Sequence, residues 1–188
     1  SSKRQKAALV LSQSVTQAMQ NLAMSGGQLQ IAVTPCEPYS YGIDQIEFLI
    51  AAHAGSTPRP LSKVASGGEL ARISLAISVI TSKASFTPTL IFDEVDSGIG
   101  GAVAQTVGEL LKQLGQSHQI LCVTHLAQVA AQGDHHFKVV KQQMNGKTKS
   151  GVESLGRQER IEEIARMLGG TSITDTTRRH ARELLNMT

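Results

Sequence analysis

The order of three short polar motifs constrains the fold of this 188-residue chain more than any other feature of its sequence. They are Ser-Gly-Gly-Glu at 66–69, Asp-Glu at 93–94 and Thr-His at 124–125. The first opens a helical pattern of apolar residues, and each of the others directly follows a short apolar run that predicts a strand. A helical pattern separates these two strands, which predicts a right-handed parallel crossover. Because α/β sheets bind ligands at the carboxyl ends of parallel strands, the polar pairs are candidate site residues.

The remaining periodicity predicts an α/β chain with a mainly parallel sheet and flanking helices. Helices are expected at 1–23, 66–82, 101–114, 160–168 and 174–185, and strands at 29–33, 45–52, 89–92, 120–123, 137–142 and 148–155. We expect two parts, a coiled-coil stub at 1–23 and a lobe at 24–188. The stub carries apolar residues at the three-four spacing of a coiled-coil seam, namely Ala8, Leu11, Val15, Ala18 and Leu22. A single amphipathic surface helix is the alternative.

Each polar motif has a chemistry that suits a nucleoside triphosphate. Ser66-Gly67-Gly68 at the start of a helix offers a hydroxyl and bare backbone N–H groups to a phosphate, with an ordinary N-cap serine as the alternative. Asp93 is expected to hold Mg²⁺ through a water, and Glu94 to orient or deprotonate an attacking water. His125 lies where its ring could donate to the same phosphate, with a structural histidine as the alternative.

Two other glycine-containing stretches look like phosphate-binding motifs but fail their requirements. Met24-Ser25-Gly26-Gly27-Gln28 precedes a strand pattern, whereas a phosphate-binding Ser-Gly-Gly must open a helix, so we interpret it as a turn. Gly146-Lys147-Thr148 ends like a P-loop, but Lys141 stands where the first glycine is required, and Asn145-Gly146 predicts a hairpin tip. The chain is therefore expected to carry half of a nucleotide site.

Composition bounds the setting and the partners. A net charge of +3 and an aromatic content of 3% give little support for nucleic-acid binding. Two cysteines without a motif suit a reducing compartment, and we find no signal peptide or membrane-length apolar run, so a soluble cytoplasmic protein is expected. His135-His136 lacks the partners of a metal site. The lysines of the predicted hairpin at 137–155 are most simply a solvated face, with DNA contact as the minority interpretation.

At these motifs the chain resembles the SMC-like branch of the ABC ATPase superfamily, and most closely the RecN family of bacterial DNA repair proteins. The resemblance is carried by four stretches: Val64-Ala-Ser-Gly-Gly-Glu-Leu-Ala-Arg-Ile, Leu90-Ile-Phe-Asp-Glu-Val-Asp-Ser-Gly-Ile-Gly-Gly101, Leu121-Cys-Val-Thr-His-Leu-Ala-Gln-Val-Ala-Ala131 and Ile161-Glu-Glu-Ile-Ala-Arg-Met-Leu-Gly-Gly170. It covers nearly the whole chain. Gly98-Ile-Gly-Gly101 separates it from SMC proteins, which usually have Leu-Asp after this turn.

The resemblance implies a head assembled from both ends of one polypeptide, with a coiled coil between them and the P-loop in an N-terminal lobe. ATP and Mg²⁺ would lie between two heads of a homodimer, with the signature motif of one head facing the P-loop of the other. Beside Ser66-Gly67-Gly68, nucleotide contacts would involve Glu69, Asp96 and Ser97. The family also implies recombinational repair of DNA double-strand breaks at the nucleoid, and DNA as a partner rests on the family alone.

Other function classes stay open at this level. Another SMC-like ATPase head would fit the same motifs. An ABC transporter nucleotide-binding domain would carry its P-loop upstream of the signature, and residues 1–65 contain none. A non-catalytic coiled-coil interaction module is a third possibility, against which the intact Glu94 and His125 argue.

Overall fold

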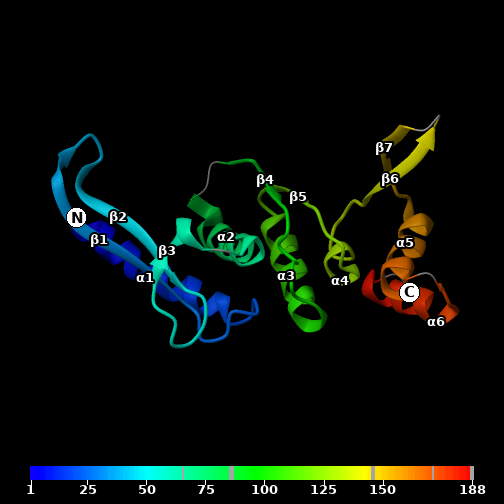
Figure 1. Ribbon diagram of the computed structural model, residues 1–188, viewed down its shortest axis with the longest axis horizontal. Coiled ribbons are helices and arrows are strands. Elements are labelled where there is room, and N and C mark those ends of the chain that lie inside the picture. Colours follow the sequence, from blue (N-terminus) through cyan, green and yellow to red (C-terminus); the bar gives the residue numbers. More distant parts are fainter. Residues whose placement is uncertain (65, 85–86, 145–146, 171, 187–188) are drawn as a thin grey trace. The chain divides into compact units, whose positions relative to one another are not determined.

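The computed structural model describes residues 1–64, 66–84, 87–144, 147–170 and 172–186 of the chain (Figure 1). The chain forms two compact units, Ser1–Thr124 and His125–Thr188. The division into a coiled-coil stub at 1–23 and a lobe at 24–188 stays a prediction.

The first unit begins with a helix packed on a three-stranded antiparallel sheet. These elements are α1 (Ser2–Met19), β1 (Gln28–Tyr39), β2 (Gly42–Ala51) and β3 (Arg59–Pro60). The register pairs Leu29 with Ile50, which confirms the predicted pairing of the first two strand patterns. Four apolar side chains of α1 and the segment that follows it are fully buried, namely Val15, Met19, Leu22 and Met24. The predicted seam residues Val15 and Leu22 thus pack inside the unit itself.

Helix α1 also covers the outer edge of β1, the first strand of the sheet order β1-β2-β3. The hydroxyl of Ser12 accepts a hydrogen bond from the Ile31 amide at 3.1 Å, and that of Thr16 accepts one from the Leu29 amide at 3.0 Å. Unpaired edge amides attract other strands. Two small polar residues on the helix therefore satisfy part of this edge.

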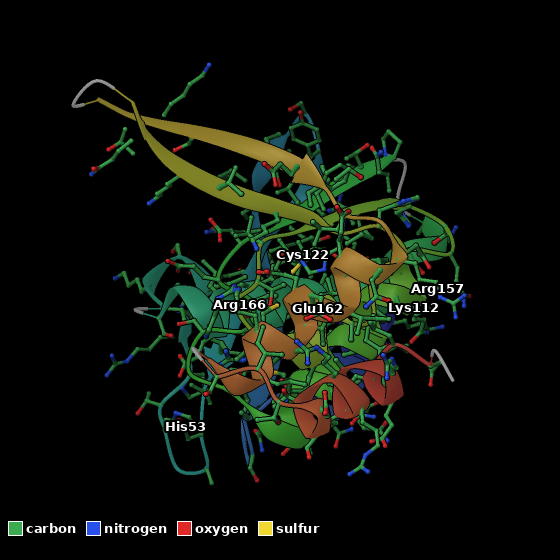
Figure 2. All side chains as sticks on the ribbon, turned by 90° about the vertical axis from the view of Figure 1, so that its right-hand side faces the viewer. His53, Lys112, Cys122, Arg157, Glu162 and Arg166 are labelled. Carbon is green, nitrogen blue, oxygen red and sulfur yellow. The ribbon has the colours of Figure 1, made fainter. Side chains whose placement is uncertain are left out.

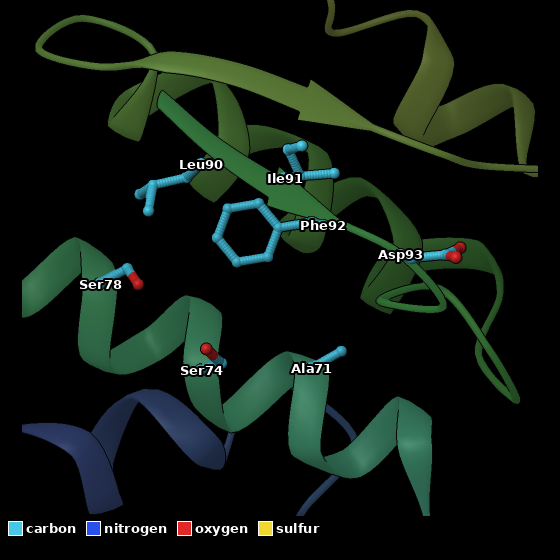
Figure 3. Close-up of a pocket in the computed structure, with 7 residues that line it drawn as sticks. All are labelled: Ala71, Ser74, Ser78, Leu90, Ile91, Phe92 and Asp93. Carbon is cyan, nitrogen blue, oxygen red and sulfur yellow. The ribbon is translucent and has the colours of Figure 1, made fainter. Parts of the chain in front are cut away.

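The centre of the first unit is the predicted strand–helix–strand crossover, preceded by a buried helix. It comprises α2 (Gly67–Thr81), β4 (Thr89–Phe92), α3 (Gly101–Leu114) and β5 (Gln119–Cys122), with short 3₁₀ turns at Leu61–Lys63 and Ser82–Ala84. Strands β4 and β5 pair in parallel, with Leu90 opposite Ile120, as predicted. Phe92 is buried and points toward α2 (Figure 3). Ile91 and Leu121 occupy the other face and are exposed.

The second unit is a hairpin joined to a small helical cluster. Its elements are α4 (Ala127–Ala130), β6 (Phe137–Met144), β7 (Lys147–Ser154), α5 (Arg157–Gly169) and α6 (Asp175–Leu184). The hairpin is antiparallel, as predicted, with Val139 opposite Val152. The predicted turn at Asn145-Gly146 lies outside the described residues. The core gathers apolar side chains of the three helices, including Ala127, Ile161, Ile164 and Ala181.

Two buried charges on α5 hold this unit together. Arg160 donates hydrogen bonds to backbone carbonyls of residues 130, 131, 133 and 134, which closes the chain after α4. Glu163 accepts two ion pairs at 2.6 Å, from Arg166 on its own helix and from Lys138 on β6. The hydrogen bonds from Arg166 and Lys138 lower the pKa of Glu163 to about 2, although burial opposes this shift. Glu163 therefore ties the hairpin to α5 (Figure 2, which labels Arg166).

The α/β class is confirmed, but fewer strands pair in parallel than the expected mainly parallel sheet requires. Among the described strands, β4 and β5 alone pair in parallel, and the rest form antiparallel sheets. The physical reason is the length of the connections, because strands joined by a tight turn can pair only in antiparallel fashion. In the described part of the chain, none of the helices combines the length and apolar character needed to cross a membrane.

Candidate functional site

The predicted Ser-Gly-Gly-Glu motif opens α2, as its chemistry requires. Ser66 is the N-cap, in an extended conformation, and its hydroxyl accepts a hydrogen bond from the Glu69 amide at 3.3 Å. The Ser66 carbonyl accepts from the Leu70 amide, so the helix starts without distortion. Glu69 lies in the first turn, 3.7 Å from the ring Nε2 of His53. The exposed Gly67 thus lies in the first turn of α2, where backbone N–H groups have no partner within the helix.

The carboxylate of Glu94 lies against this helix start. A Cβ atom placed on Gly67 would overlap Glu94 Oε2. Glu94 itself has φ 57°, which is rare for a residue with a side chain. The backbone conformation after β4 thus turns the glutamate toward the first glycine of α2. Two motifs that are 27 residues apart in the sequence meet here.

The loop that follows Glu94 is held by its own backbone and by the end of β5. Asp93 Oδ1 accepts a hydrogen bond from the Glu94 amide at 2.9 Å, and the Ser97 amide donates to the Glu94 carbonyl at 3.0 Å. Asp96 is 2% exposed, and its carboxylate accepts a hydrogen bond from the hydroxyl of Thr124. Thr124 follows β5, so the Thr-His motif helps to hold the loop that follows the Asp-Glu motif. The carboxylate of Asp96 is thus buried and hydrogen-bonded within the unit, and its contact with a nucleotide stays a prediction.

Ser97 and Gly68 bring the same loop into contact with α2. A Cβ atom on Gly68 would lie 3.0 Å from both the Cβ and the carbonyl oxygen of Ser97. Glycine at this position therefore permits a close approach of the loop to the helix. The structure thus brings together residues 66–69, 93–97 and 124.

Arg72 completes the contact and was not singled out from the sequence. It is 5% exposed, and its Nη1 donates to the Ser97 carbonyl at 2.8 Å. Burial lowers the pKa of Arg72, and the negative charge of Glu69 partly offsets this. The available signal is a charge within the apolar stripe of α2, where Arg72 precedes the fully buried Ile73. An amphipathic pattern alone does not indicate what such a charge contacts.

The charges of Asp93 and Asp96 act on Cys122 at the end of β5. Burial raises the pKa of Cys122 to about 12, and the charges of Asp96 and Asp93 contribute. A cation near this edge would meet carboxylate oxygens, which are the ligands that Mg²⁺ prefers. Asp93 is exposed and uses one oxygen for the Glu94 amide. Within the described ranges, no three His, Cys, Asp or Glu side chains gather in one place.

His125 directly follows Thr124 and is the first residue of the second unit, with an exposed side chain. Its role beside a phosphate stays a prediction from the sequence.

The second Ser-Gly-Gly stretch, at residues 25–27, forms a turn as expected, and its glycine amides already have hydrogen-bond partners. The Gly26 amide donates to Gln20 Oε1 at 2.8 Å, and the Gly27 amide donates to the Met24 carbonyl at 2.9 Å. Residues 24–27 therefore form a turn before β1.

Comparison with known proteins gives one consistent group of relatives by sequence. No protein-family model matches the chain. Proteins named DNA repair protein RecN match from Xylella fastidiosa strain 9a5c with 51% identity over 185 residues, from Haemophilus influenzae with 46% over 186 and from Deinococcus radiodurans with 44% over 183. These matches cover 97–98% of this chain but 32–33% of each relative, in its C-terminal part. The chain thus spans about a third of the length of the relatives.

Solved structures with a similar fold are heads of SMC proteins. The Smc head domain with a coiled coil and joint from Pyrococcus yayanosii has a TM-score of 0.60 at 21% identity, covering 86% of this chain and 29% of that one. The Smc head from Pyrococcus furiosus, bound to the C-terminal domain of ScpA, has a TM-score of 0.56 at 24% identity, covering 87% and 39%. At these identities the likeness concerns the fold.

Proposed function

Because this chain belongs to the RecN family and matches the C-terminal part of its members, we propose that it is the C-terminal lobe of an ATP-hydrolysing head. The full protein would act in recombinational repair of DNA double-strand breaks, in the cytoplasm and at the nucleoid. This lobe would supply the signature motif, the Walker B carboxylates and the switch histidine. The N-terminal lobe would supply the P-loop.

The observation that carries the proposal is the meeting of the motifs at the start of α2. Gly67 touches the Glu94 carboxylate, Gly68 touches Ser97, and Asp96 holds Thr124. An arrangement that handles phosphate, a cation and water needs these groups close together.

The roles follow from the chemistry of each group. Asp93 offers an exposed oxygen that would hold Mg²⁺ through a water, and the ion would screen the phosphate charge. Glu94 would orient or deprotonate the attacking water. A ring N–H of His125 would donate a hydrogen bond to a phosphate oxygen. Ser66-Gly67-Gly68 and Glu69 would receive the nucleotide of a second head, and Ser97 would lie beside it.

The Glu94 contact also bears on when hydrolysis occurs. The carboxylate lies beside Gly67, so a phosphate bound at the start of α2 would come close to it, and two anions repel each other at short range. A phosphate arriving at Gly67 would therefore displace Glu94 from α2. The displaced carboxylate would be free to act on water, which links head engagement to hydrolysis.

The exposed apolar face of the crossover supports a second lobe. Ile91, Leu121 and Val123 are 70%, 45% and 63% exposed. Parallel strands are normally covered on both faces. The P-loop lobe would cover this face, and two such heads would enclose ATP between them as a homodimer.

The test of the proposed function is Glu94→Gln in the full-length protein. The amide keeps the shape of the side chain but loses the charge and the base, so turnover should fall at least about a hundredfold while ATP still binds. Steady-state ATPase rates and a nucleotide-binding assay measure the two effects. The control is Glu47→Gln, an exposed glutamate on β2, which should leave turnover unchanged. Near wild-type turnover in Glu94→Gln would contradict the assignment.

A further inference from the structure

Arg72 connects the two parts of the candidate site within one chain. Its Nη1 donates to the Ser97 carbonyl at 2.8 Å, and a Cβ atom on Gly68 would lie 3.2 Å from the same nitrogen. The guanidinium therefore lies close to the second glycine of the motif and holds the loop through the Ser97 carbonyl. The start of α2 and the loop are joined by a side chain as well as by close backbone packing.

This placement is costly for a residue that only fills space. Arg72 is 5% exposed, and its Nε is buried without a hydrogen bond to any of the described residues. A charged group loses hydration when it is buried, and an apolar side chain would fill the same stripe beside Ile73 without that loss. The contact with Ser97 is what the arginine adds.

The loop between the carboxylates and Ser97 is fixed at a second point. The Asp96 carboxylate is bound by Thr124 at the end of β5, and the Ser97 amide is bound by the Glu94 carbonyl. Any shift of Ser97 is therefore passed to the backbone of Glu94 through a hydrogen bond of 3.0 Å. Glu94 has an uncommon backbone conformation with φ 57°, which needs such support from its surroundings.

We propose that Arg72 is a positioning residue that couples the Ser-Gly-Gly start of α2 to the backbone of Glu94, so that a phosphate docking on α2 resets the catalytic carboxylate of the same head. The inference rests on the proposed function. Arg72 acts through Ser97 and does not touch the nucleotide. Its loss leaves ATP binding in place and weakens the link between engagement and hydrolysis.

The first test needs no nucleotide and uses this chain as it is. Arg72→Met keeps the buried stem and removes every donor. Hydrogen–deuterium exchange of the peptide covering 94–100 should become about five to ten times faster, as expected for the loss of one supporting hydrogen bond, while β4 and β5 stay protected. The control, Arg59→Met, removes an exposed arginine of β3 and should leave this exchange unchanged. Unchanged exchange in Arg72→Met would overturn the proposal.

The second test uses the full-length protein and separates kcat from KM. Arg72→Met should lower kcat at least about tenfold and leave KM for ATP within about twofold, because an interaction that matters only during hydrolysis is lost. A rise in KM at constant kcat would overturn the positioning role. Arg72→Lys keeps the charge but not the planar fork, so it should show the same split with a smaller loss.

The remaining outcomes are also decisive. Should Arg72→Met fail to fold, Arg72→Lys carries both measurements, and unfolding of both variants would make the residue structural and refute the proposal. A wild-type full-length protein without ATPase activity would overturn the proposed function, while the exchange result still decides whether Arg72 holds the loop.

Discussion

At the scale of single residues, the neighbouring glycines at the start of α2 face different surroundings. The nearest atom to an added Cβ on Gly67 is the tip of Glu94, which can rotate away. The nearest atoms at Gly68 belong to Ser97 and include its backbone oxygen, which is held by Arg72. The same substitution should therefore have opposite effects at adjacent positions.

We expect Gly67→Ala to leave the free energy of unfolding unchanged or to raise it by up to about 1 kcal/mol, because alanine favours a helix. Gly68→Ala should lower it by about 1 kcal/mol, since the strain of overpacking exceeds that gain. Urea unfolding of the chain, followed by circular dichroism, measures both. In the full-length protein both variants should lose ATPase activity, because a methyl group blocks approach to the amides. Equal destabilisation by the two changes would contradict the packing described here.

At the scale of elements, the sequence predicts most of the regular structure but few of the contacts that join it. The crossover was predictable because two four-residue apolar runs flank an amphipathic helix, and Ser66 was recognisable as an N-cap. The position of Arg72 was not, because its partner is a backbone carbonyl 25 residues away, and any residue can provide a carbonyl. The contact between Gly67 and Glu94 depends on a left-handed backbone conformation that glutamate rarely adopts, so no propensity could predict it.

The link between β6 and α5 gives a pH prediction at this scale. The folded pKa of Glu163 is about 2, below its ordinary value of 4.5, so its stabilising effect is full above that value and disappears as the pH falls toward 2. Glu163→Gln should lower the free energy of unfolding by about 1–3 kcal/mol at pH 7, and the difference should vanish near pH 2. Urea unfolding at several pH values provides the measurement.

Glu162→Gln is the matched control on the same helix (Figure 2 labels Glu162). Glu162 is 38% exposed and pairs with Arg178 at 3.0 Å. An exposed ion pair of this kind contributes at most about 1 kcal/mol. A pH-independent difference between Glu163→Gln and the wild type would show that the carboxylate charge does not stabilise the unit.

At the scale of the whole molecule, this chain by itself should neither bind ATP tightly nor hydrolyse it. The adenine, ribose and inner-phosphate contacts are assigned to the P-loop lobe, and the Glu94 carboxylate already lies at the Gly67 end of α2. Isothermal titration of the chain with ATP and Mg²⁺ should show no heat of binding at micromolar concentrations. Micromolar affinity would refute the assignment of half a site.

The composite site can be tested by mixing two inactive full-length variants. Ser66→Arg obstructs the signature surface, because Ser66 is exposed at the helix start, and a P-loop variant blocks nucleotide binding in the other lobe. If the signature serves the partner's nucleotide, a mixed dimer has one site with both lesions and one with none. Partial recovery of ATPase activity on mixing supports this arrangement. Proven heterodimers without recovery would exclude it.

The hydroxyls of Ser12 and Thr16 have a mechanical consequence. Each grips a backbone amide of β1, four residues apart on the helix and two apart on the strand. Helix α1 cannot twist about its axis or slide along the strand without breaking both bonds together. A force applied along or around this helix is therefore transmitted to β1 and, through its pairing with β2, to the sheet. The two hydroxyls thus couple the helix mechanically to the sheet.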